Sequence, residues 1–149
     1  MKSAWMLAVL LLICSRTVAS QTISVSGDPA PMTVSNAVAG TQPIAATGAT
    51  LYTISTPKGG GNRSFAITAQ LNAPMPAGVT LTATFAVPTA GGTSLGAVTL
   101  DATTRDVITN LPKNVNSTQG ITYQVAAVVS AGVVSTSTRV VTLTILQTP

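Results

Sequence analysis

The stretch Val79-Thr80-Leu81-Thr82-Ala83-Thr84-Phe85-Ala86-Val87 alternates apolar with small, mostly polar side chains. Because successive side chains of a β-strand point to opposite faces, this period of two predicts a strand with one buried face. The same pattern recurs over residues 65–71, 121–129 and 141–145, and more briefly over residues 50–55. After residue 20, no stretch has the period of an amphipathic helix. The chain is therefore expected to be all-β.

Segments rich in glycine and proline separate these strands and predict turns, at residues 56–62, 72–78, 88–92 and 130–132. Weaker strands are expected at residues 22–26, 31–36, 96–100 and 106–109. A parallel sheet is disfavoured because it needs crossover helices. The spacing predicts a single antiparallel immunoglobulin-like β-sandwich of about 7–9 strands. Its core is expected to hold valine, isoleucine, leucine and alanine, with Tyr52, Phe65, Phe85 and Tyr123 as the larger fillers.

The N-terminal twenty residues have the pattern of a signal peptide. Lys2 precedes an apolar run over residues 5–14, and Val18-Ala19-Ser20 supplies the small residues that a signal peptidase prefers. Cleavage is expected between Ser20 and Gln21, which leaves residues 21–149 as one domain. The apolar run is too short to cross a bilayer, which takes about 20 residues. We therefore expect a secreted protein, extracellular or at the cell surface, with no transmembrane segment in its mature chain.

Residues 21–149 contain no Cys, His, Glu or Trp, and their only acidic residues are Asp28, Asp101 and Asp106. These are the side chains on which most acid–base, nucleophilic and metal chemistry depends. We therefore expect a protein that is not an enzyme, with no catalytic residues, no metal site and no cofactor. The glycine-rich residues 59–64 lack the helix and lysine of a phosphate loop and are interpreted as a hairpin loop.

Charge is scarce in the mature chain and lies in or beside the predicted turns. Five basic residues and three aspartates leave a formal charge of +2 for residues 21–149. Scattered cations without aromatic platforms make nucleic acid an unexpected partner. The strand interiors have almost no charge to protect a sheet edge from pairing with another strand. This pattern favours association by β-strand addition, although a threonine-rich outer face is also compatible with a monomer.

The segment after the cleavage site is the candidate donor strand for such an addition. Ile23 and Val25 lie on one face of residues 21–26, and Met32 and Val34 are expected to extend that face. Gly27-Asp28-Pro29 resembles a hinge that would release the strand. The C-terminal residues 139–147 are an alternative donor, but they are interpreted more simply as a strand of their own domain. The N-terminal strand also has the simpler interpretation of an ordinary first strand.

The signal peptide, the Thr/Ala/Gly-rich sandwich and the alternation through Val141, Leu143 and Ile145 resemble small secreted bacterial fimbrial or filament subunits. The resemblance implies a structural subunit that self-associates into a homopolymer or joins other cell-surface proteins. The alternative is a monomeric secreted adhesive or ligand-binding module. Asn62 and Asn116 begin Asn-X-Ser/Thr sequons, so each is a candidate glycosylation site.

Overall fold

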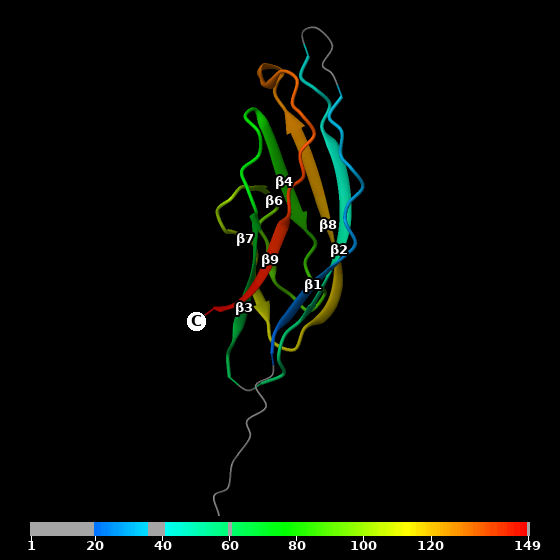
Figure 1. Ribbon diagram of the computed structural model, residues 1–149. Coiled ribbons are helices and arrows are strands. Elements are labelled where there is room, and N and C mark those ends of the chain that lie inside the picture. The colour runs from blue at the N-terminus through cyan, green and yellow to red at the C-terminus, as the bar shows by residue number, and fades with distance from the viewer. Residues whose placement is uncertain (1–19, 36–40, 60, 149) are drawn as a thin grey trace, which may run out of the picture.

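The strands form two antiparallel sheets that pack face to face (Figure 1). The computed structural model describes residues 20–35, 41–59 and 61–148. The signal peptide predicted for residues 1–20 therefore lies outside the described residues, apart from Ser20. The elements are β1 (Thr22–Ser26), β2 (Ala46–Ser55), β3 (Ser64–Leu71), β4 (Val79–Phe85), β5 (Thr93–Ser94), β6 (Ala97–Leu100), β7 (Arg105–Pro112), β8 (Asn116–Ala127), the short 3-10 helix η1 (Val129–Ala131) and β9 (Val141–Thr148).

One sheet has the strand order β1-β2-β8-β4-β6 and the other the order β5-β7-β3-β9. Every paired neighbour is antiparallel. The antiparallel β-sandwich predicted from the alternation is confirmed. The sequence did not predict β5, whose two residues are too short to show a period.

Most chain-consecutive strands lie in opposite sheets, which corrects the interpretation of the glycine-rich loop. β2 belongs to the five-stranded sheet and β3 to the four-stranded sheet. The segment between them is therefore a crossover from one sheet to the other, and the predicted hairpin is wrong. A local sequence specifies that the chain turns, but which sheet receives the next strand depends on distant pairing partners.

The strand expected over residues 31–36 is also absent from its described part, residues 31–35. Pro29 and Pro31 remove two backbone donors from this segment, so it is a poor ladder strand. Its contact with β2 is made by side chains instead. A Cβ at Gly48 would lie 3.1 Å from Met32 Sδ and 3.2 Å from Pro29 Cβ. The missing side chain at Gly48 therefore lets the segment lie close against the strand.

The core between the sheets contains the four expected aromatic residues. Tyr52, Phe65, Phe85 and Tyr123 are each at most 5% exposed, which confirms their prediction as core fillers. The rings of Tyr52 and Phe85 meet edge to face, with centroids 5.8 Å apart. The Tyr52 hydroxyl donates a hydrogen bond to the Ala86 carbonyl at 2.6 Å. Burial raises the pKa of Tyr52 to about 12, so the phenol stays neutral well above physiological pH.

Charged residues lie at or beyond the strand ends, as the sequence predicted. Arg105 and Asp106 begin β7, while Lys113 follows its last residue. In the described part of the chain, no helix has the length and apolar character needed to cross a membrane.

Candidate functional site

The longest sheet edge belongs to β9. Four strands end the sheet orders, and β9 has 8 residues against 5 in β1, 4 in β6 and 2 in β5. Within the described residues, its main chain pairs along the strand with β3 alone. No charged residue and no proline occurs between Val141 and Thr148. This strand lacks the usual side-chain features that keep an edge from accepting another strand.

Hydrogen bonds fix β9 at both ends of its pairing with β3. At its start, the Val140 N–H donates to the Asn72 side-chain oxygen at 2.9 Å, and the Asn72 N–H donates back to the Val140 carbonyl at 3.0 Å. At its end, the hydroxyls of Ser64 and Thr148 are hydrogen-bonded. Ile145, only 8% exposed, points into the core between these anchors. β9 is therefore a firmly held strand whose outer side has no ladder partner among the described residues, although β1 lies nearby.

The candidate donor residues divide into a strand pair and a loop pair. Ile23 and Val25 lie opposite Ile54 and Tyr52, so both face the inner side of the sheet. Ile23 packs against the core, whereas Val25 is 43% exposed. Met32 also packs against the core, and Val34 is half-buried, but both lie in the irregular segment after β1. The structure thus brings Ile23 and Val25 together on one strand and leaves Met32 and Val34 outside it.

The predicted cleavage site immediately precedes β1. Ser20 is exposed, and its hydroxyl donates to the Gln21 carbonyl at 3.2 Å. Strand pairing starts at the next residue, Thr22, opposite Ser55. All described strands of the sandwich therefore lie after the predicted cleavage site.

A buried threonine ties two loops together at the end of the sandwich that carries the β2–β3 connection and the β7–β8 turn. The Thr56 hydroxyl accepts a hydrogen bond from the Val115 N–H at 2.8 Å and donates one to the Pro112 carbonyl at 3.1 Å. The Thr56 N–H also donates to the Val115 carbonyl at 2.8 Å. This Thr56 clamp satisfies buried polar groups of both loops and fixes their relative position.

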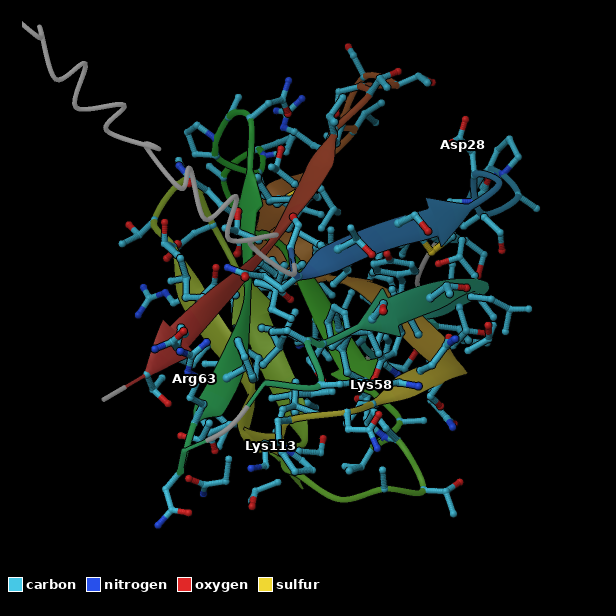
Figure 2. All side chains as sticks on the ribbon, turned by 90° about the horizontal axis from the view of Figure 1, so that it is seen from below. Asp28, Lys58, Arg63 and Lys113 are labelled. Atoms are coloured by element: carbon cyan, nitrogen blue, oxygen red, sulfur yellow. The ribbon has the colours of Figure 1, made fainter. Side chains whose placement is uncertain are left out.

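Three basic side chains project from these clamped loops, and we call this end of the molecule the basic end. They are Lys58, Arg63 and Lys113, which Figure 2 shows on the loops of this end, with Asp28 apart from them. The Lys113 ammonium donates to the Gly61 carbonyl at 2.9 Å. A Cβ at Gly59 would lie 3.7 Å from Arg63 Nη1. Arg63 and Lys113 therefore lie against the same glycine-rich loop.

A hollow of about 390 Å³ opens between these loops. Its lining combines two cations with neutral polar groups and one apolar ring: Asn62, Arg63, Ser64, Asn110, Pro112 and Lys113. Asn110 has a φ of 53°, a left-handed conformation that asparagine adopts more readily than most residues. The hollow is thus an open, positively charged surface site whose hydrogen-bond donors come from two segments of the chain, residues 62–64 and 110–113, set in a lining with more apolar than polar surface.

The acidic residues lie away from the basic end. Asp106 is six residues along β7 from Pro112, which corresponds to roughly 20 Å of strand. Asp101 lies beside Leu71, at the opposite end of β3 from Ser64, because its carbonyl accepts from the Leu71 N–H. The Arg105 guanidinium donates to both carboxylate oxygens of Asp101 and holds the pKa of that carboxyl below its ordinary value. Positive charge at the basic end is therefore not neutralised locally.

The described residues contain no group of three or more His, Cys, Asp or Glu side chains placed to hold a metal ion.

The two candidate glycosylation sites, Asn62 and Asn116, are both exposed, Asn62 at the hollow and Asn116 at the start of β8. Their glycosylation stays a prediction.

Sequence reasoning missed the hollow because its cations are fifty positions apart in the chain. The clamp that joins them depends on Thr56, one of many threonines in a threonine-rich sequence, and no local pattern distinguishes it. The only available signal was charge: three of the five basic residues of the mature chain lie in two of its turns.

Comparison with known protein families, with curated proteins and with solved structures finds no match for this chain. The β9 edge and the basic end are therefore the two candidate functional features of the described chain.

Proposed function

We propose that this chain is a secreted, non-enzymatic structural subunit that assembles into an extracellular filament or surface layer by β-strand addition. The observation that supports this most is the β9 edge, eight residues long and without charge or proline. A second copy that adds a strand there would satisfy main-chain groups along the whole edge. The scarcity of charge in the other strands points the same way, because it removes repulsion between neighbouring copies.

β1 is the proposed donor. It is short, and its side chains make one weak hydrogen bond to β2, from the Ser26 hydroxyl to the Leu51 carbonyl at 3.4 Å. Gly27 follows it with a φ of 70° and has open space around its α-carbon. β1 also passes close to β9 on the same side of the sandwich (Figure 1). A released β1 would thus start on the side of its own copy that carries β9, and we propose that it pairs with β9 of a neighbouring copy.

The assembly proposal is tested by placing charge on the β9 edge. Thr142 and Thr144 are exposed, so the T142K/T144K double variant adds two lysines without disturbing the core. We expect the purified parent chain to form polymers in negative-stain micrographs and by light scattering, and the double variant to stay monomeric, because lysines on an edge strand oppose pairing.

The matched control is T80K/T84K, which adds the same charge to exposed positions of β4. β4 is hydrogen-bonded to β8 along its whole length and to β6 over residues 81–84, so most of it offers no edge. This control should polymerise like the parent chain; equal loss in both variants would mean that charge, not the β9 edge, governs assembly. A parent chain that stays monomeric would exclude the role of structural subunit.

Deletion of residues 21–27 tests the donor separately, and unchanged particle size would exclude β1 as the donor strand.

A second candidate function, a monomeric adhesive or ligand-binding module, is favoured by the hollow at the basic end. It predicts uniform small particles and a ligand-dependent rise in melting temperature.

A further inference from the structure

Two positive side chains meet at one hollow, and neither has an acidic partner. Within the described residues, the only ion pair joins Arg105 to Asp101, far from Arg63 and Lys113. Lys58 adds a third positive charge at the same end (Figure 2). Cations grouped without counter-charges raise the local potential and attract anions. The basic end is therefore the part of the described surface best suited to a negatively charged ligand.

The cations differ in what they recognise. The planar guanidinium of Arg63 can pair two donors with a carboxylate or sulfate, while the Lys113 ammonium acts as a compact charge. The remaining polar lining consists of the Asn62 and Asn110 amides and the Ser64 hydroxyl. Amides and hydroxyls both donate and accept, as the hydroxyl groups of a sugar do. The lining thus combines charge recognition with neutral hydrogen bonding.

We propose that this hollow binds the carboxylate or sulfate groups of an acidic polysaccharide. The inference rests on the secreted location proposed above, but it does not require assembly. A nucleic acid is disfavoured because no aromatic side chain lines the hollow to stack on a base, and three cations give little coverage of a phosphate backbone.

Hydrogen bonds within the chain preorganise the loops of this site. The Thr56 clamp fixes the turn that carries Lys113 against the start of the β2–β3 connection. The Lys113 ammonium is in turn bonded to the Gly61 carbonyl, on the loop that precedes Arg63. Binding then requires little ordering of the chain, which lowers its entropic cost.

Titration calorimetry of the purified chain with dextran sulfate, polygalacturonate and neutral dextran tests the proposal. We expect one or both acidic polymers to bind and neutral dextran not to bind. The R63Q/K113Q variant should weaken that binding by about tenfold or more, because it removes both charged contacts. The matched control R105Q/R139Q removes two cations elsewhere, the exposed Arg105 and the half-buried Arg139, and should change the affinity less than about twofold.

Each other outcome overturns the inference. Equal loss in both double variants would mean attraction by net charge alone, and unchanged binding by R63Q/K113Q would place the ligand elsewhere. Tighter binding of single-stranded DNA, or of free sulfate at the same sulfate concentration, would assign the hollow to nucleic acid or to a small anion. Absence of binding to both acidic polymers would also overturn it. Light scattering of the same samples reports assembly independently, and the single R63Q and K113Q variants replace the double variant if its melting temperature falls.

Discussion

β1 and β9 are both edge strands on the same side of the sandwich, yet the chain holds them very differently. β9 pairs with β3 over eight positions and is fixed at its ends by Asn72 and by the Ser64–Thr148 hydroxyl pair. β1 pairs with β2 over five positions, next to a glycine with open space around it. In the proposed assembly, the anchored edge would suit an acceptor and the weakly held edge a donor.

Truncation of the inward isoleucine on each strand gives the largest expected contrast. Ile145→Ala on β9 removes a core side chain that is 8% exposed and should lower the free energy of unfolding by about 2–4 kcal/mol. Ile23→Ala on β1 removes a half-buried side chain and should cost about 1 kcal/mol. Urea denaturation of both variants measures the two values. Equal costs would show that β1 is held as firmly as β9.

Alkaline pH tests the strand that supports β1. Tyr52 lies on β2 opposite Val25, and burial raises its pKa to about 12, above the ordinary value near 10. Because the folded-state pKa is the higher one, this contribution to stability is complete below pH 10 and is lost as the pH rises from about 10 to 12. The loss should be roughly 2–3 kcal/mol, measured by urea denaturation across that range.

Tyr52→Phe is the control for this titration, because it removes the ionisable group and keeps the ring in the core. The variant should lose about 1 kcal/mol at neutral pH, since its hydrogen bond to Ala86 is gone. Burial also raises the pKa of Tyr123, so the variant should still lose some stability at alkaline pH, but less than the parent chain. A pH dependence identical to that of the parent chain would exclude Tyr52 as its source.

The sequence predicted the strands better than it predicted their connections. Alternation identified residues 65–71 and 141–145 because each strand has one face in the core, which imposes a period of two. It failed over residues 31–35, where Pro29 and Pro31 and the gap at Gly48 let a segment pack without a ladder. The strands in general were predicted to carry little charge that could protect a sheet edge, but the unequal anchoring of β1 and β9 depends on contacts such as Asn72 with Val140, 68 positions apart. Such contacts depend on the topology of the sheets, which the local alternation of apolar and polar residues does not specify.

Asn72→Ala tests the anchor at the start of β9. The substitution leaves the Val140 N–H without its 2.9 Å acceptor and should lower the free energy of unfolding by about 1 kcal/mol. Amide hydrogen exchange at Val140 should become faster. Gln70→Ala is the matched control, because this amide bonds to Ala102 and Thr104 and not to β9. Exchange at Val140 that rises equally in both variants would mean that Asn72 is no specific anchor.

The smallest expected effect on stability is also the most informative about β1. Val25 is 43% exposed, so Val25→Thr should change the free energy of unfolding by no more than about 0.5 kcal/mol. If β1 inserts beside β9 of a second copy, the same side chain becomes buried in the assembly, and its hydroxyl would then be desolvated at a cost of about 1–3 kcal/mol. Polymer formation, followed by light scattering, should therefore fall far more than stability does. Val133→Thr, at a fully exposed position in the β8–β9 connection, should leave both unchanged. Equal scattering by the two variants would indicate that β1 is an ordinary first strand. If β1 were the donor, burial of the hydroxyl that Val25→Thr adds would lower polymer formation.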